Sequence, residues 1–121
     1  MMHTDLKVYQ ESILLVKDIY NLTKDFPKDE QWGLVSQMKR AVISVPSNIA
    51  EGSGRKTRNE LNQFLNIAMG SLTELDTHLE IAGVLGFVVD AGVLTRTKNR
   101  LDEVKRMLAA LQRSLTAPSP S

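Results

Sequence analysis

The sequence predicts an all-α protein with the architecture of an antiparallel up-down-up-down four-helix bundle. In four separate segments, apolar residues recur at alternating three- and four-residue steps, which places them on one face of a helix. The breaks between these segments are short, so consecutive helices are expected to be antiparallel neighbours. No segment shows the two-residue alternation that is typical of a half-buried strand.

The first helix is expected to begin near Asp5, a good N-cap, and to run to about Asp25. Two apolar stripes lie side by side on it and cover an arc of roughly 160°, which is wide for a helix that has one solvent-exposed face. Either this helix sits deep in the bundle, or part of the arc meets another subunit. The stripe interpreted as the bundle seam is Leu6, Tyr9, Ile13, Val16 and Tyr20, and the second stripe is Leu15, Ile19, Leu22 and Phe26 with Val8.

The second helix is predicted at about residues 28–51 and contains a proline. Its apolar spacing continues through Pro46, although a proline inside a helix costs about 3 kcal/mol. The pattern favours one helix bent at Pro46, with Ser44, Ser47 or a water relieving the freed carbonyl, and leaves open a break into two shorter helices. Trp32, the only tryptophan, is interpreted as a packing residue that caps the bundle end, with an interface role as the alternative.

The third and fourth helices carry the most regular apolar ladders. The third is predicted at about 57–85, where Thr57 and Glu60 fit a capping box and Gly86 is expected to end the helix. The fourth is expected to follow Asp90 as its N-cap. The two ladders are Leu61, Leu65, Ala68, Leu72, Leu75, Leu79 and Ala82, then Leu94, Thr97, Leu101, Val104, Leu108, Leu111 and Leu115.

Composition sets the class of protein. With 121 residues, 42% apolar and 24% charged, the chain has the make-up of one soluble domain, predicted at 1–115 and followed by a disordered tail at 116–121, TAPSPS. The lack of cysteine excludes thiol catalysis and cysteine-based zinc sites. The N-terminus lacks the apolar core of a signal peptide, and no apolar run approaches a membrane span, so a cytoplasmic protein without membrane contact is expected.

The net charge of +1 conceals a strong asymmetry along the chain. Residues 1–38 carry −2, 39–58 carry +4, 59–95 carry −5 and 96–121 carry +4. Basic patches can bind polyanions even when the whole chain is nearly neutral. They can equally pair with acidic segments of neighbouring helices, which is how the basic face of the last helix is interpreted.

The basic segment surrounds the turn between the second and third helices. Gly52 and Gly54 are expected to supply the positive φ that a helix C-terminus needs. Arg55, Lys56 and Arg58 follow at the N-terminus of the third helix, where the macrodipole is already positive. The turn is either a solvated loop or an anion site that contacts nucleic acid through N–H groups and guanidinium forks.

The motifs of common enzymes are missing. The segment GSGRK lacks the spacing of a phosphate-binding Walker loop, and no dinucleotide GxGxxG, nucleophile elbow or HExxH helix occurs. The paired Glu-x-x-His motifs of di-iron bundles are also missing. His78 is interpreted as a partly buried polar neighbour. No catalytic residue, metal ligand or cofactor is therefore predicted, and the protein is not expected to be an enzyme.

Three stretches carry a resemblance to a known family. They are DLKVYQ with IYNLTKDFP, then GLVSQMKRAVISVPSNIAEGSGRK, then FLNIAMGSLTELDTHLEIAGVLGF. Over about residues 5–88 the chain resembles the bacterial four-helix-bundle family of 23S rRNA intervening-sequence proteins, which is related to accessory proteins of diversity-generating retroelements. Two departures are Tyr9, where a tryptophan is usual, and Met69, where a basic residue is common; Met69 removes one charge from any shared anion surface.

The resemblance implies a ring-forming homo-oligomer, typically a pentamer, with RNA or DNA and a reverse transcriptase or another protein as partners. The basic surface that it carries over is Lys39, Arg40, Arg55, Lys56 and Arg58, and the structural part of the motif is Ser44, Pro46, Asn48, Glu51, Gly52 and Gly54. Asn48 and Glu51 are expected to tie the turn through side-chain hydrogen bonds. Two functions follow as hypotheses: an oligomeric nucleic-acid-binding adaptor, and a structural or protein-binding scaffold whose basic residues only pair with acidic neighbours.

Overall fold

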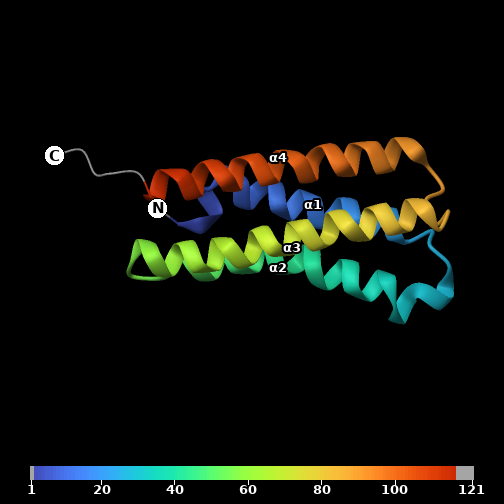
Figure 1. Cartoon of the computed structure of the whole chain (residues 1–121), viewed down its shortest axis with the longest axis horizontal. Helices are drawn as coiled ribbons and strands as arrows, with labels where there is room; N and C mark the ends of the chain where they lie inside the picture. Colours follow the sequence, from blue (N-terminus) through green and yellow to red (C-terminus); the bar gives the residue numbers. More distant parts are fainter. Residues whose placement is uncertain (1, 117–121) are drawn as a thin grey trace.

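The computed structural model describes residues 2–116, which form four α-helices and no strand (Figure 1). The helices are α1 (Lys7–Thr23), α2 (Leu34–Ser53), α3 (Arg58–Val84) and α4 (Ala91–Thr116), with the short 3-10 helices η1 (His3–Asp5) and η2 (Lys28–Trp32) before α1 and α2. The predicted all-α four-helix fold is thereby confirmed. Within the same residues, no helix combines the length and the apolarity that crossing a membrane requires.

Each long helix packs against two others. Helix α1 contacts α2 and α4, and helix α3 contacts the same two, so the four helices close into a bundle. The start of α1, the α2–α3 turn and the end of α4 lie together at one end, as up-down-up-down topology requires (Figure 1). The predicted tail at 116–121 lies outside the described residues, except for Thr116, the last residue of α4.

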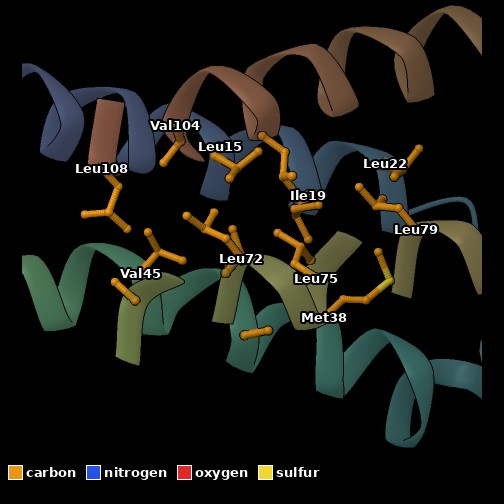
Figure 2. Close-up of a cluster of buried hydrophobic side chains, with 14 of the residues drawn as sticks. Leu15, Ile19, Leu22, Met38, Val45, Leu72, Leu75, Leu79, Val104 and Leu108 are labelled. Carbon is orange, nitrogen blue, oxygen red and sulfur yellow. The ribbon is translucent and has the colours of Figure 1, made fainter. Parts of the chain in front are cut away.

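The core is built from the predicted ladders of α3 and α4 and from the apolar residues whose helical spacing predicted α2, and these meet between the helices (Figure 2). The apolar residues of α2 are Val35, Met38, Val42, Val45 and Ile49. In α1, however, the prediction of the seam is wrong. The second stripe is buried, whereas Ile13 and Tyr20 of the first stripe are 44% and 41% exposed. The buried residues of α1 and of the segment after it are Val8, Ser12, Leu15, Ile19, Leu22, Thr23 and Phe26.

The first two helices begin later than expected. Asp5 lies in η1, and α1 starts at Lys7 with Leu6 at its N-cap, so the predicted start at Asp5 is wrong. The segment before α2 is the 3-10 helix η2 rather than the first turn of an α-helix. Trp32 ends η2 with 90% of its surface exposed, which contradicts its interpretation as a packing residue.

Helix α2 continues through Pro46 without a break, and the alternative of two shorter helices is wrong. Pro46 is buried, and its missing N–H leaves the helix one backbone hydrogen bond short. Polar side chains bond to carbonyls next to this gap. The Ser47 hydroxyl donates to the Ile43 carbonyl at 2.8 Å, and the Asn48 amide donates to the Ser44 carbonyl at 2.7 Å.

Three helix ends form at the predicted residues, with one of the two capping-box bonds present at Thr57. The Thr57 hydroxyl accepts the backbone N–H of Glu60 at 3.1 Å and caps α3. The Asp90 carboxylate accepts the backbone N–H of Gly92 at 2.8 Å and caps α4. Gly86 has φ +74° directly after α3, a conformation that glycine adopts without steric cost. These caps fix the turns at both ends of α3.

Candidate nucleic-acid interface

The α2–α3 turn is shaped by a close approach of two helices. Gly52 is buried in the last turn of α2, where a Cβ atom would lie 2.9 Å from side-chain atoms of Leu61 and Phe64. Gly54 follows with φ −87° and ψ 0°. The prediction that these two glycines supply positive φ is therefore wrong, since Gly86 alone among the described residues has that conformation. Position 52 needs glycine because α3 leaves no room for a side chain.

Arg55 is held in place at this turn by two contacts. Its guanidinium forms an ion pair with the Glu51 carboxylate one helical turn earlier. The same guanidinium lies over the ring of Phe64, 4.8 Å from the ring centroid. Both partners of the ion pair are exposed, so the pair adds little stability. Its main effect is to orient Arg55 and to neutralise part of its charge.

Lys56 and Arg58 remain the accessible cations of the turn. Both are exposed, and neither takes part in an ion pair with any other described residue. They flank the N-cap of α3, where the first backbone N–H groups of the helix also point outward. Three cations and the carboxylates of Glu51 and Glu60 leave residues 51–60 with a net charge of +1. The turn is thus a small cationic surface at the end of the bundle.

An amide cluster adjoins the turn, and the sequence analysis missed it. The Gln112 amide of α4 donates to the side-chain oxygens of Asn62 and Asn66 on α3, at 3.1 and 2.7 Å. Asn62 and Asn66 follow Arg58 at four-residue steps and therefore share its helix face. This four-residue spacing is the feature of the sequence from which the cluster could have been predicted. Asn66 is exposed, and Asn62 and Gln112 are half-buried. Amides beside cations can bind both phosphates and base edges, so the cluster extends the polar surface of the turn along α3.

Lys39 and Arg40 lie elsewhere on the molecule. Arg40 precedes Arg55 by 15 residues, which corresponds to about 22 Å along α2. The Lys39 ammonium lies over the Tyr20 ring of α1, 4.5 Å from its centroid. Arg40 instead lines a cleft between α2 and α3. The structure therefore brings together Arg55, Lys56 and Arg58 and separates Lys39 and Arg40 from them.

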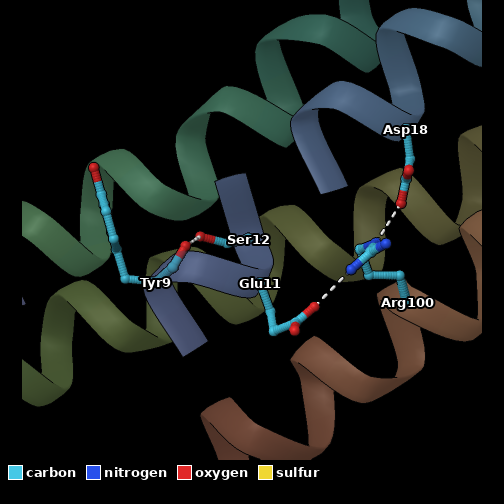
Figure 3. Close-up of polar contacts among 5 residues, drawn as sticks. All are labelled: Tyr9, Glu11, Ser12, Asp18 and Arg100. Carbon is cyan, nitrogen blue, oxygen red and sulfur yellow. Dashed lines mark hydrogen bonds and ion pairs between the residues drawn. The ribbon is translucent and has the colours of Figure 1, made fainter. Parts of the chain in front are cut away.

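Several cations of α4 are neutralised by acidic neighbours, as the sequence indicated. The Arg100 guanidinium lies between two carboxylates of α1, 2.7 Å from Glu11 and 2.5 Å from Asp18 (Figure 3). Burial alone would lower the pKa of Arg100, but the hydrogen bonds to Asp18 and Glu11 outweigh it and raise the pKa. Lys105 lies 3.6 Å from Asp76 of α3. Pairing on this scale makes the face of α4 a weaker candidate for an anion site.

The motif residues of α2 form a small polar network against α3. The Ser44 hydroxyl accepts from the Asn48 amide and from the Ser71 hydroxyl, each at 2.9 Å. Asn48 thus ties α2 to itself near Pro46, and the expectation that it ties the turn is wrong. Glu51 does reach across the turn, through its ion pair with Arg55. The network links the proline segment of α2 to the middle of α3.

His78 is the most buried ionisable side chain of α3, with 5% of the residue exposed. Its Nε2 atom lies 3.6 Å from a Glu74 carboxylate oxygen, and its Nδ1 atom has no hydrogen-bond partner among the described residues. Burial lowers the pKa of His78 despite the opposing effect of Glu74, so the ring is neutral at pH 7. Across the described residues, no three potential His, Cys, Asp or Glu ligands gather around one point.

The fold and the turn define the class: a small all-α bundle protein with a cationic surface at one end. The chain belongs to the 23S rRNA-intervening sequence protein family, whose family model matches residues 4–110. It is similar in fold to the crystal structure of a protein of unknown function from the S23 ribosomal protein family of Bacteroides thetaiotaomicron. That match has a TM-score of 0.78 at 24% identity and covers 88% of this chain and 98% of the other. None of the curated proteins matches the chain significantly.

Proposed function

We propose that this protein is a non-enzymatic adaptor that binds RNA or DNA through the α2–α3 turn. The observation that carries the proposal is the pair of exposed cations, Lys56 and Arg58, which flank the N-terminus of α3 without an ion-pair partner among the described residues. Arg55 is already oriented beside them. Such a surface recognises phosphate by charge and by backbone N–H groups, without reading sequence.

Affinity at this surface requires repetition, because one turn with a net charge of +1 binds a polyanion weakly. A homo-oligomer places several copies of the turn on one ligand and raises the avidity without any new contact. The family resemblance makes a pentameric ring the arrangement to test first, with a reverse transcriptase or another protein as a further partner. Nucleic-acid ligands and a chain without cysteine fit a cytoplasmic location.

Charge reversal of the turn is expected to abolish binding at low salt. The variant R55E/K56E/R58E replaces three cations by carboxylates, so phosphates are repelled where they were attracted. Fluorescence anisotropy with mixed-sequence RNA and duplex DNA over a salt series measures this. For the intact protein, affinity should fall steeply with salt, and each duplex phosphate contact that a milder variant loses should make the slope shallower by about 0.9.

The matched control is K17E/K24E/R96E, which reverses three exposed cations of α1, its C-terminal end and α4, away from the turn and from η2. Its net charge equals that of the turn variant, so a general loss of charge would affect both equally. The control is expected to bind nearly as well as the unaltered protein. Equal binding by all three proteins, with assembly confirmed for each, would remove the turn as the site.

A scaffold is the second candidate function, and the apolar groove between α1 and α2 favours it. The groove encloses about 330 Å³ and is lined by side chains that include Ile13, Ile43 and Pro46. Ile13 and Ile43 are exposed, and Tyr20 extends the same stripe along α1. An uncovered apolar stripe of this kind is typical of a subunit contact. The misassigned seam of α1 is therefore the face that we propose another subunit covers.

Assembly through this groove is expected to fail in I13E/I43E, because each carboxylate would have to be buried at the contact. Size-exclusion chromatography with light scattering at micromolar concentration should show an oligomer for the unaltered protein and a smaller species for the variant. V89E, which places a carboxylate at an exposed position between α3 and α4, is the control and should assemble normally. A monomeric unaltered protein would contradict both the ring and the scaffold.

A further inference from the structure

The side chain of Trp32 is the largest apolar group that this structure leaves in contact with water. It ends η2, just before α2, and 90% of its surface is exposed. An indole in this position adds nothing to the core, and its exposure is unfavourable in the free protein. Aromatic side chains on protein surfaces commonly serve as contact platforms, because they offer a large flat area with few rotatable bonds.

Trp32 stands at the edge of a cleft of about 390 Å³ between η2, α2 and α3. This volume lies in the range of small-ligand sites. The other lining residues are Ser36, Gln37, Arg40, Ala41, Ser44, Ser71 and Glu74. Apart from Ala41, each of them has a polar side chain. The cleft therefore combines one aromatic side chain with a polar lining, unlike the apolar groove between α1 and α2.

The polar lining of the cleft contains both hydrogen-bond donors and hydrogen-bond acceptors. The Arg40 guanidinium is exposed and has no ion-pair partner among the described residues. On α3, the Glu74 carboxylate is more than half exposed, and among the described residues its one ion-pair partner is His78, at 3.6 Å from Nε2. The hydroxyls of Ser44 and Ser71 are already bonded to each other and hold the two helices together at this point. The charged groups of the lining are thus the Arg40 guanidinium and the Glu74 carboxylate.

We propose that this cleft binds one unpaired nucleobase of a single-stranded nucleic acid, stacked on Trp32 and hydrogen-bonded by Arg40 and Glu74. This inference rests on the proposed adaptor function and adds a second contact to it. A groove that only tracked phosphates would be lined by cations, and Glu74 would oppose that use. A base edge instead offers donors to a carboxylate and acceptors to a guanidinium, while its face stacks on an indole.

The cleft is within reach of a strand that also contacts the cationic turn. Both sites are built from α2 and α3, and Arg40 is about 22 Å from Arg55 along α2. About six nucleotides span this length if they are stacked as in a helix, at about 3.4 Å each. A duplex hides its base faces in the stack, so only a single strand or an unpaired loop can use both sites. The proposal therefore predicts a preference for single strands that the turn alone would not give.

Trp32 itself reports the contact, since it is the only tryptophan in the chain. Titration of the full-length protein with a mixed-sequence single-stranded 12-mer RNA is expected to quench its fluorescence, and the matching duplex is expected to leave it unchanged. W32A should weaken single-strand binding by roughly tenfold or more and duplex binding by less than twofold. W32F keeps an aromatic ring and should retain most of the affinity. V89A, at another exposed apolar position, is the control and should bind like the unaltered protein.

The outcomes separate this inference from the adaptor proposal. If R55E/K56E/R58E loses binding while W32A binds both ligands normally, the base site is wrong and the adaptor stands. If the unaltered, assembled protein binds neither ligand, both proposals are wrong. Trp32 fluorescence that changes with protein concentration alone, or with a protein partner but not with RNA, would make the cleft a protein contact and would also overturn the base site.

Discussion

Leu72→Ala is expected to lower the free energy of unfolding by about 2–5 kcal/mol. Leu72 lies in the middle of α3, fully buried among side chains of the core (Figure 2). Truncation removes the transfer free energy of its buried carbons and leaves a cavity that the rigid helices around it can only partly close. Denaturation in guanidinium chloride measures the change in unfolding free energy. The slope of the transition should equal that of the unaltered protein.

Ile67→Ala is the matched control for the core variant. Ile67 is on the same helix, but half of its surface is exposed. Its truncation is expected to change the unfolding free energy by less than about 1 kcal/mol, because little apolar area returns to water. Equal losses in the two variants would contradict the division of α3 into a buried and an exposed face.

Gly52→Ala is expected to destabilise the fold by roughly 1–3 kcal/mol, although alanine is the better helix former. The added Cβ would lie 2.9 Å from Phe64 Cβ and 3.3 Å from the Leu61 carbonyl oxygen, and neither atom can swing aside as a side-chain tip can. Helices α2 and α3 would have to separate at the turn. Thermal unfolding measures the loss, and the shift should also disturb Arg55, whose guanidinium stacks on Phe64.

Gly70→Ala is the control for this effect, and its change in stability is expected to have the opposite sign. Gly70 lies inside α3 at a position where an added Cβ would have no neighbouring atom within 4 Å, so alanine meets open space. The substitution is expected to stabilise the protein by about 0.5–1 kcal/mol through helix propensity alone. If Gly52→Ala were stabilising as well, the close approach of α2 and α3 would not be the reason for glycine at the turn.

The sequence predicted the fold where local pattern and burial agree. The three- and four-residue spacing of the α3 and α4 ladders is unbroken. The helix ends are also local features: Thr57 and Asp90 bond to backbone N–H groups within three residues, and Gly86 needs only one unusual backbone angle. The α1 seam failed for the opposite reason. Both of its stripes have helical spacing, so periodicity shows that α1 is a helix but does not tell which stripe faces the core.

The candidate site was predictable only in part, because it depends on distances that a sequence does not contain. Arg55 and Arg58 are neighbours in the chain and remain so in the fold. Arg40 belongs to the same charged segment, yet the length of α2 carries it away from the turn. Trp32 is exposed at the end of the 3-10 helix η2, where the pattern indicated the first turn of a regular α-helix.

The contact between Arg100 and α1 determines how the first and last helices line up. Leucine ladders repeat every seven residues, so α4 could slip by one heptad, about 10.5 Å, and still place leucines in the core. Glu11 and Asp18 are the only two carboxylates of α1, themselves one heptad apart, and Arg100 engages both. A slip toward the start of α1 would leave it beside Glu11 alone. A slip the other way would bring it to Asp18 and to Asp25, which follows one heptad later but lies past the end of α1 at Thr23. Arg100 therefore favours the observed axial register over others that hydrophobic packing alone would accept.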